Sequence, residues 1–399
     1  MIRRTLETKL KEAAHHFPVV TLTGPRQSGK TTLVKEVFKN YAYQTLELPD
    51  VRTFAVEDPR GFLAQFKGPV ILDEIQRTPE LFSYIQVEVD KKGGKPGQFI
   101  LTGSQNFLMM QSISQSLAGR CAVLHLLPFS LSELLNRDPF PLNHIGKKLP
   151  ECSKPANINL WETLFTGFYP RIHDKKIPPR SWLSSYYMTY VERDVRNIIK
   201  IGDIDAFGRF IRLCAGRCGQ IVNLSSLGSD CGVSHTTVKR WLSVLEASFI
   251  IIFLRPHYKN FGKRLIKSPK LYFLDTGLLC YLLQITSESE IFHRAERGAI
   301  FESFVISEIY KNFVHMGDQP NIYFWRDRKG HEVDMIIDRG TELTPIEIKS
   351  AQTIASDFFL NLNYWLQLSG DPDGAAALIY GGDEAFVRSG VCVYPWWAL

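Results

Sequence analysis

The fold of the first part of the chain is decided by the stretch Thr23-Gly24-Pro25-Arg26-Gln27-Ser28-Gly29-Lys30-Thr31-Thr32. It fits the pattern G-x-x-x-x-G-K-[ST], which forms a phosphate-binding loop when a strand precedes it and a helix follows it. Both conditions are met, because residues 18–22 are apolar and predict a buried strand, and residues 33–38 place apolar side chains on one side of a helix. The stretch therefore predicts an α/β domain with a nucleotide site.

Each part of this loop has an expected task. Gly24 and Gly29 let the backbone N–H groups surround a phosphate, and the helix that follows adds its positive end. Lys30 is expected to bind the β- and γ-phosphates of ATP, and the hydroxyl of Thr31 to hold Mg²⁺. The predicted nucleotide-binding residues of the loop are Gly24, Pro25, Arg26, Gln27, Ser28, Gly29, Lys30, Thr31 and Thr32.

A second apolar strand, residues 69–72, ends in the carboxylates Asp73 and Glu74. Asp73 is predicted to bind Mg²⁺ through water, and Glu74 to polarise the water that attacks the γ-phosphate. A third apolar strand, residues 98–102, ends in small polar residues, and the ends of parallel strands lie beside the same ligand. The residues expected to sense the γ-phosphate are therefore Ser104, Gln105 and Asn106.

Three stretches resemble the prokaryotic AAA-type, or archaeal-ATPase-like, family: Thr23 to Thr32, Val70 to Arg77 and Leu101 to Asn106. Members of this family usually pair an ATPase domain with a C-terminal domain of unknown function. The segments 116–120 and 126–130 are also typical of the family. By this resemblance Arg120 would contact the γ-phosphate, in its own chain or from a neighbouring subunit of a homo-oligomer. A surface ion pair is the alternative role for Arg120.

Composition limits the class of protein. A chain of 399 residues with 45% hydrophobic content is long enough for two or three domains. It has no apolar run of about 18 residues, so no membrane partner is expected. Its seven cysteines, an odd and scattered set, favour reduced thiols and a cytoplasmic location. The net charge of +6 permits binding to DNA without requiring it.

The pattern of apolar, helical and proline-rich segments predicts five regions. They are a P-loop ATPase domain with a parallel sheet at 1–135, a linker at 136–158, a helical connector at 159–204, a winged helix at 205–285, and a second α/β domain at 290–399.

The winged helix is predicted from three helices and a strand pair at 205–217, 224–231, 235–247, 249–254 and 270–273. In helix-turn-helix proteins the second helix of the motif enters the major groove, and Lys239 and Arg240 lie on it here. The loop between the strands has basic residues suited to the backbone of double-stranded DNA: Arg255, Lys259, Lys263, Arg264, Lys267 and Lys270. A protein-packing module is the alternative.

The last region has a second set of charged residues. Glu302 lies on a predicted helix, and Glu347 and Lys349 lie two apart on a strand, so they face the same side. Together with Asp334 on the adjoining strand, they have the chemistry to hold a divalent metal and position a water for phosphodiester hydrolysis. This set resembles the D…E-x-K signature of the restriction-endonuclease-like fold. The resemblance implies metal ligands at Glu302, Asp334 and Glu347 beside Lys349; an inactive domain of that fold, or a hairpin with solvated charges, is the alternative.

Three functions are compatible with these motifs. The first is a Mg²⁺-dependent ATPase whose nucleotide state controls its C-terminal domains. The second is a DNA nuclease gated by ATP. The third is a nucleic-acid- or protein-binding switch that turns ATP over slowly. The sequence does not separate them, because substrate identity lies in surfaces that have no short motif.

Overall fold

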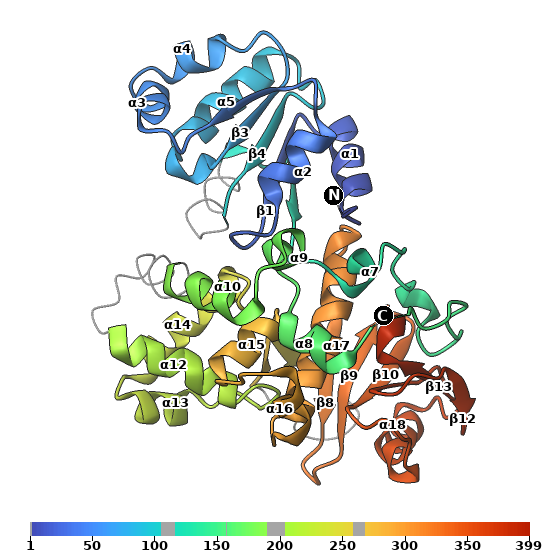
Figure 1. Ribbon diagram of the computed structural model, residues 1–399. Helices are drawn as coiled ribbons and strands as arrows, with labels where there is room; N and C mark the ends of the chain where they lie inside the picture. Colours follow the sequence, from blue (N-terminus) through green and yellow to red (C-terminus); the bar gives the residue numbers. More distant parts are fainter. Residues whose placement is uncertain (1, 105–115, 157, 190–203, 258–267) are drawn as a thin grey trace. The chain divides into compact units, whose positions relative to one another are not determined.

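The computed structural model describes residues 2–104, 116–156, 158–189, 204–257 and 268–399 (Figure 1). They divide into two compact units. The first comprises residues 1–129, 247–249 and 313–318, and the second comprises 130–246, 250–312 and 319–399.

The first unit contains a five-stranded parallel sheet in the order β2-β3-β4-β1-β5. The strands are β1 (Val19–Thr23), β2 (Ala42–Thr45), β3 (Val70–Asp73), β4 (Phe99–Thr102) and β5 (Cys121–His125). Strands β1, β3 and β4 are buried along their whole length, which explains why their sequences are continuous apolar runs rather than alternating ones. The predicted parallel sheet is therefore confirmed.

Helices cover both faces of this sheet (Figure 1). They are α1 (Glu7–His16), α2 (Lys30–Val37), α3 (Pro49–Glu57), α4 (Pro59–Ala64) and α5 (Leu81–Lys91), with a short 3₁₀ turn η1 (Ile75–Arg77) after β3. Helices α1 and α2 pack their apolar sides on one face, against Val20, Leu22 and Ile100. Helices α3, α4 and α5 pack on the other, against Val19 and Leu72. Neighbouring residues of β1 face opposite cores, because successive side chains of a strand point to opposite faces of the sheet.

The second unit is built on a mixed eight-stranded sheet in the order β12-β13-β11-β10-β9-β8-β6-β7. Its strands are β6 (Ile251–Pro256), β7 (Lys270–Phe273), β8 (Ile322–Arg326), β9 (Glu332–Asp338), β10 (Leu343–Lys349), β11 (Ala377–Tyr380), β12 (Phe386–Arg388) and β13 (Val391–Pro395). Strands β8, β9 and β10 are antiparallel neighbours, whereas β10, β11 and β13 run parallel.

A helical region precedes and flanks this sheet. Its helices are α7 (Leu131–Leu134), α8 (Leu160–Thr166), α9 (Pro170–Lys175), α10 (Pro179–Tyr186), α12 (Ile204–Gly216), α13 (Leu224–Cys231), α14 (His235–Ala247), α15 (Thr276–Leu282), α16 (Glu288–His293), α17 (Arg297–His315) and α18 (Leu360–Ser369). Single turns of 3₁₀ helix lie at η2 (Leu142–His144), η4 (Ser356–Phe359) and η5 (Trp396–Ala398). Of the described helices, none is both long and apolar enough to cross a membrane.

The strand pair expected in a separate winged helix belongs instead to the large sheet. Strand β6 pairs with β7 on one side and, in parallel, with β8 on the other, through Arg255↔Tyr323 and Pro256↔Phe324. Ile251, Ile252 and Leu254 of β6 are all buried, so this strand needs cover on both faces, which a small wing does not offer. The sheet therefore runs across the boundary that the sequence pattern suggested near 285–290.

Candidate functional site

The loop between β1 and α2 takes a conformation that requires its two glycines. A Cβ at Gly24 would lie 2.1 Å from the carbonyl oxygen of Leu126, which no side chain tolerates. Gly29 has φ 94°, in the left-handed region, directly before the first residue of α2. The backbone thus turns sharply from the buried strand into the helix, as the motif predicts.

Lys30 is the first residue of α2, and its ammonium folds back onto the loop. Its Nζ donates hydrogen bonds to the carbonyl oxygens of Gly24 at 3.1 Å and Pro25 at 2.8 Å. Burial lowers the pKa of Lys30 to about 8, against the opposing influence of Glu74 and Asp73. An anion placed against this lysine would favour its charged form.

Asp73, at the end of β3, accepts hydrogen bonds from three hydroxyl groups. Thr31 on α2 donates to its Oδ2 at 2.9 Å, Tyr43 on β2 donates to the same oxygen at 2.8 Å, and Thr102 on β4 donates to Oδ1. No lysine or arginine of the described residues forms an ion pair with this buried carboxylate. Carboxylate and hydroxyl oxygens are the ligands that Mg²⁺ prefers, so Thr31 and Asp73 fit the predicted metal.

Glu74 follows Asp73 with φ 59° and ψ 41°, a left-handed conformation that is rare outside glycine. The Nε2 of Gln76, on η1, donates to Oε2 of Glu74 and, at 3.1 Å, to Oγ of Ser104 after β4. Two further polar atoms of the region, Oγ of Ser28 and Oε1 of Gln76, are buried without a hydrogen-bond partner. Gln76 was not predicted to be functional, although it lies two residues after the predicted base Glu74.

The remaining predicted sensors, Gln105 and Asn106, lie outside the described residues. The structure thus brings together the loop, Asp73, Glu74 and Ser104 at the carboxyl ends of the parallel strands, where open α/β sheets bind ligands.

The second set of charged residues gathers in the other unit. Strands β9 and β10 pair antiparallel through Met335↔Ile346, so Asp334 and Glu347 occupy neighbouring positions. Lys349 donates to Oε1 of Glu347, and its Nζ lies 3.8 Å from Oδ2 of Asp334. The second oxygen of Glu347 is buried and has no hydrogen-bond partner. Burial and the nearby Asp334 raise the pKa of Glu347 to about 8.

Glu302, on α17, lies at the other end of this cluster and is occupied by different partners. Tyr272 donates to its Oε1, and the Nζ of Lys270 is 3.3 Å from the same oxygen. Lys270 also pairs with Glu332, which the sequence analysis overlooked. Burial raises the pKa of Glu302 to about 7. Among the described residues, no three acidic, histidine or cysteine side chains meet in a metal-binding arrangement.

The expected role of Lys270 is wrong. It was assigned to a basic loop facing DNA, but its side chain is only 4% exposed and points into the acidic cluster. Lys270 and Tyr272 lie two apart on β7 and so share one strand face, which places both beside Glu302. The alternation of polar and apolar residues in β7 is the sequence feature that indicates that Lys270 and Tyr272 share a face.

Comparison with known proteins defines the family. A family model described as an AAA domain matches residues 16–135, and two models for domains of unknown function match residues 157–289 and 297–399. Uncharacterized proteins of Mycobacterium tuberculosis and Mycobacterium bovis are each 30% identical over 395 residues, covering 98% of this chain and 82% of theirs. The chain belongs to the family of P-loop AAA-domain proteins with C-terminal domains of unknown function. The resemblance seen in the sequence is confirmed.

Solved structures show more distant similarity. A Walker-type ATPase of Pyrococcus abyssi is 17% identical with a TM-score of 0.42, over 71% of this chain and 96% of that one. AMPPCP-bound DnaA from Aquifex aeolicus is 15% identical with a TM-score of 0.28, over 60% of this chain and 85% of that one.

Within the AAA domain, Arg120 lies at the wrong edge of the sheet to contact a nucleotide of its own chain. Its carbonyl accepts the N–H of Val19 at the start of β1, whereas the phosphate loop leaves β1 after Thr23. Four residues of strand separate these ends by about 13 Å. The side chain pairs with Asp90, Nε to Oδ1 at 2.7 Å. The structure shows the surface ion pair, and a contact of Arg120 with the γ-phosphate stays a prediction.

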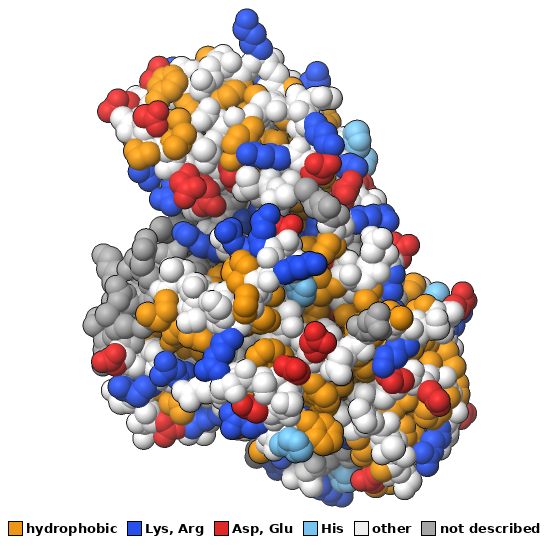
Figure 2. Space-filling view, viewed as in Figure 1, with side chains coloured by type: hydrophobic (Ala, Val, Ile, Leu, Met, Phe, Trp, Pro, Cys, Tyr) orange, Lys and Arg blue, Asp and Glu red, His pale blue; other side chains and the backbone are white. Residues whose placement is uncertain are grey.

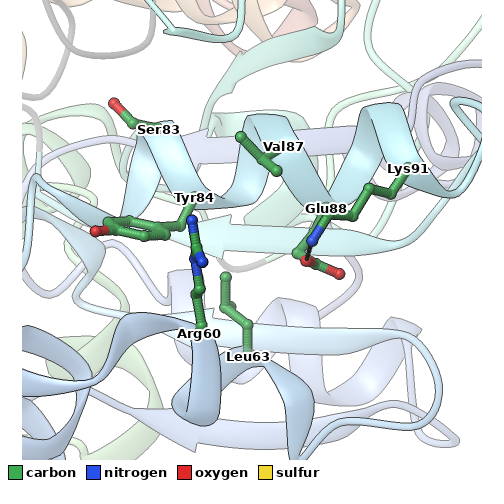
Figure 3. Close-up of a pocket in the computed structure, with 7 residues that line it drawn as sticks. All are labelled: Arg60, Leu63, Ser83, Tyr84, Val87, Glu88 and Lys91. Atoms are coloured by element: carbon green, nitrogen blue, oxygen red, sulfur yellow. Dashed lines mark hydrogen bonds and ion pairs between the residues drawn. The ribbon is translucent and has the colours of Figure 1, made fainter.

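A small pocket of the AAA domain lies between α4 and α5 (Figure 3). Its volume is about 140 Å³, and its lining residues are Arg60, Leu63, Ser83, Tyr84, Val87, Glu88 and Lys91. None of the predicted nucleotide-binding residues lines it. It is thus separate from the phosphate loop, and its paired Glu88 and Lys91 leave it without a distinct chemistry.

Lys239 and Arg240, which were predicted to contact DNA, lie on α14 and are both exposed. Of the predicted basic loop, Arg255 is exposed on β6, while Lys259, Lys263, Arg264 and Lys267 lie outside the described residues. In the view of Figure 2, basic and acidic side chains are interspersed over each unit.

Proposed function

We propose that the chain binds ATP with Mg²⁺ at the loop between β1 and α2 and hydrolyses it. The observation that carries this proposal is the pairing of the Thr31 hydroxyl with Asp73 beside the buried, inward-folded Lys30. These groups come from two separate motifs of the AAA domain, and their polar atoms converge without any other cation to balance Asp73 among the described residues.

Each residue has one task in this reaction. Lys30 exchanges the carbonyls of Gly24 and Pro25 for the β- and γ-phosphate oxygens, a stronger, charge-assisted interaction. Thr31 and Asp73 hold Mg²⁺, which supplies positive charge that the phosphates need. Glu74 accepts the proton of the attacking water, and Gln76, which also donates to Ser104, holds the Glu74 carboxylate in place.

The test is to measure ATP binding and phosphate release together in the Glu74→Gln variant. We expect binding to persist and turnover to fall about 10²–10⁴-fold, because the amide keeps the shape but accepts no proton. Glu57→Gln, a change at an exposed residue of α3, is the matched control and leaves both unchanged. Normal turnover by Glu74→Gln would contradict the proposal. Repeating the assay with single- and double-stranded DNA, with the oligomer mass recorded, shows whether DNA or self-association stimulates turnover.

A second candidate function concerns the acidic cluster, which we propose to be a divalent-metal site in a restriction-endonuclease-like domain. The supporting observation is the buried, unpartnered Oε2 of Glu347 beside Asp334. A buried acceptor without a partner costs about 1–3 kcal/mol, and a bound cation would remove that cost. Asp334 and Glu347 would hold the ion, with Lys349 placed to stabilise a phosphate.

Cleavage of plasmid DNA in the presence of Mn²⁺, with and without ATP, tests the nuclease part of this proposal. Asp334→Asn should remove any cleavage, while Asp373→Asn, a change in an exposed turn, should not. Retained Mn²⁺ without cleavage would point to an inactive domain of the same fold.

We also propose that α12, α13 and α14 act as a winged-helix-like DNA-binding element, with Lys239 and Arg240 toward the phosphates. The exposed position of both residues on α14 supports this assignment.

A further inference from the structure

The ammonium of Lys270 occupies a position among the carboxylates Glu302, Glu332, Asp334 and Glu347 where another cation could otherwise bind. Its Nζ lies 3.3 Å from Oε1 of Glu302 and forms a second ion pair with Glu332. Burial opposes its charged form, but Glu302, Asp334 and Glu332 outweigh that effect and raise the pKa of Lys270 above its ordinary value. The side chain is 4% exposed, so the ammonium is a permanent part of the cluster rather than a mobile surface charge.

Three carboxylate oxygens around Lys270 already have partners among the protein's own groups. Oε1 of Glu302 accepts from both Lys270 and Tyr272. The other oxygen of Glu302 faces Gly219, where an added Cβ would lie 3.3 Å from it. Glu332 pairs with Arg326 at 3.3 Å through its second oxygen. A metal ion at this end would have to displace these protein groups.

The end of the cluster formed by Asp334 and Glu347 has fewer partners than the end around Lys270. Lys349 is the only cation that pairs with them among the described residues, and one oxygen of Glu347 keeps no partner. The whole cluster has four carboxylates, Glu302, Glu332, Asp334 and Glu347, against three cations, Lys270, Arg326 and Lys349. The Asp334 and Glu347 end therefore has one ion-pair partner for two carboxyl groups, whereas the Glu302 and Glu332 end has two for two.

We infer that Lys270 is a built-in cation, which occupies one cation position of the cluster so that the cluster binds a single divalent ion. Asp334 and Glu347 hold this ion, and the ammonium of Lys270 keeps Glu302 from being one of its ligands. This inference rests on the metal site proposed above and assigns its stoichiometry. A second ion between Glu302 and Glu332 would sit against the ammonium, where like charges repel strongly in a buried site.

The experiment counts Mn²⁺ ions per chain by the loss of the free-Mn²⁺ electron paramagnetic resonance signal. It uses the full chain without nucleotide and with Asp73→Asn, so that the phosphate loop binds no ion. We expect one ion in this background. Asp334→Asn should weaken it by about tenfold or more, whereas Glu302→Gln should leave its affinity unchanged. Lys270→Met should bind a second ion, and Lys329→Met, an exposed control in the β8–β9 turn, should not.

The outcomes separate the two proposals. If the background binds no ion but Lys270→Met gains one, the metal site proposed for the natural chain fails while the role of Lys270 holds. If Lys270→Met binds no more ions than the background, or if Glu302→Gln weakens the single ion as much as Asp334→Asn does, Lys270 is not a built-in cation. Should Lys270→Met unfold, Mn²⁺ is expected to restore its melting temperature, and failure to do so overturns the inference.

Discussion

Two buried groups of carboxylates in this chain are neutralised in different ways. In the AAA domain, Asp73 is surrounded by the hydroxyls of Thr31, Tyr43 and Thr102, which stabilise its charge without cancelling it. In the second unit, Glu302 on α17 is paired with Lys270, and Glu347 on β10 is paired with Lys349. Hydroxyl groups reorient easily toward an incoming metal ion, whereas a buried ammonium does not leave.

The two sites therefore depend on a ligand to different degrees. Lys30 donates to backbone carbonyls and Asp73 accepts from hydroxyls, so an anion at Lys30 and a cation at Asp73 would each strengthen the phosphate loop. The acidic cluster is largely balanced by its own residues and keeps one unmet oxygen on Glu347. The following predictions test this contrast.

The largest effect is expected from Lys30→Ala. It removes the ammonium that the structure places inside the loop, so ATP binding and hydrolysis should both be lost. Calorimetry with ATP and a phosphate-release assay measure these. Lys39→Ala, at an exposed residue after α2, should behave as the unchanged chain. Tight ATP binding with normal turnover in Lys30→Ala would refute the nucleotide site.

A smaller loss is expected from Gln76→Leu. The amide holds the carboxylate of Glu74 and the hydroxyl of Ser104, so its removal should misplace the base without touching the bound phosphates. We expect kcat to fall about ten- to a hundredfold with KM unchanged. An equal change in KM would instead indicate that Gln76 contributes to binding ATP, and Gln76→Asn shows whether a shorter amide restores kcat.

The salt dependence of DNA binding tests which cations outside the acidic cluster contact DNA phosphates. With Lys270 buried, Lys239 and Arg240 on α14 are the described cations that we expect to face phosphates. Neutralising both should lower the slope of log affinity against log salt by about two, since each contact releases ~0.9 counterion. Lys175→Ala, an exposed change on α9, is the control. An unaltered slope would instead indicate that α12–α14 form a protein-packing module.

The pH dependence of stability should be opposite in the two regions. Glu347 has a pKa of about 8 in the folded chain, above its ordinary 4.5, so it binds more protons folded than unfolded between these values. Stability should therefore fall as pH rises from 4.5 to 8. The pKa of Lys30 is lowered from 10.5 to about 8, so the unfolded chain binds more protons between these values, and stability should instead rise as pH rises from 8 to 10.5.

Thermal unfolding in metal-free buffer, followed as a function of pH, measures both changes in stability. Glu347→Gln should remove the decline in melting temperature, and Lys30→Met the rise at higher pH. A decline that persists in Glu347→Gln would assign it to another buried acid, with Glu302 as the first candidate, because burial raises its pKa to about 7.

The smallest effect is expected from Arg120→Ala in a monomeric sample, where turnover should stay unchanged, because Arg120 pairs with Asp90 at the sheet edge away from the loop. If the chain forms a homo-oligomer and turnover falls with ATP affinity intact, Arg120 acts from a neighbouring subunit. Mixing Arg120→Ala with Glu74→Gln should then restore activity in shared assemblies.

The sequence predicted the nucleotide region well because its requirements are local. Gly24 and Gly29 are needed for backbone conformations that other residues do not take, and Lys30 and Thr31 follow them at fixed spacing. The apolar runs of β1, β3 and β4 are buried on both faces, so they could be read as parallel strands. The helices predicted at 205–217, 224–231 and 235–247 correspond to α12, α13 and α14, since the signals that start and stop a helix also act over a few residues.

The partners of the charged residues were decided by tertiary structure alone. Whether Lys270 faces DNA or Glu302 depends on β6 joining β8 across a long stretch of chain, and no short pattern contains that pairing. The placement of Arg120 at the start of β5, beside Val19, likewise depends on the order of strands in the sheet. Backbone conformation is set by neighbouring residues, but the charge balance of a buried site is set by distant residues that packing brings together.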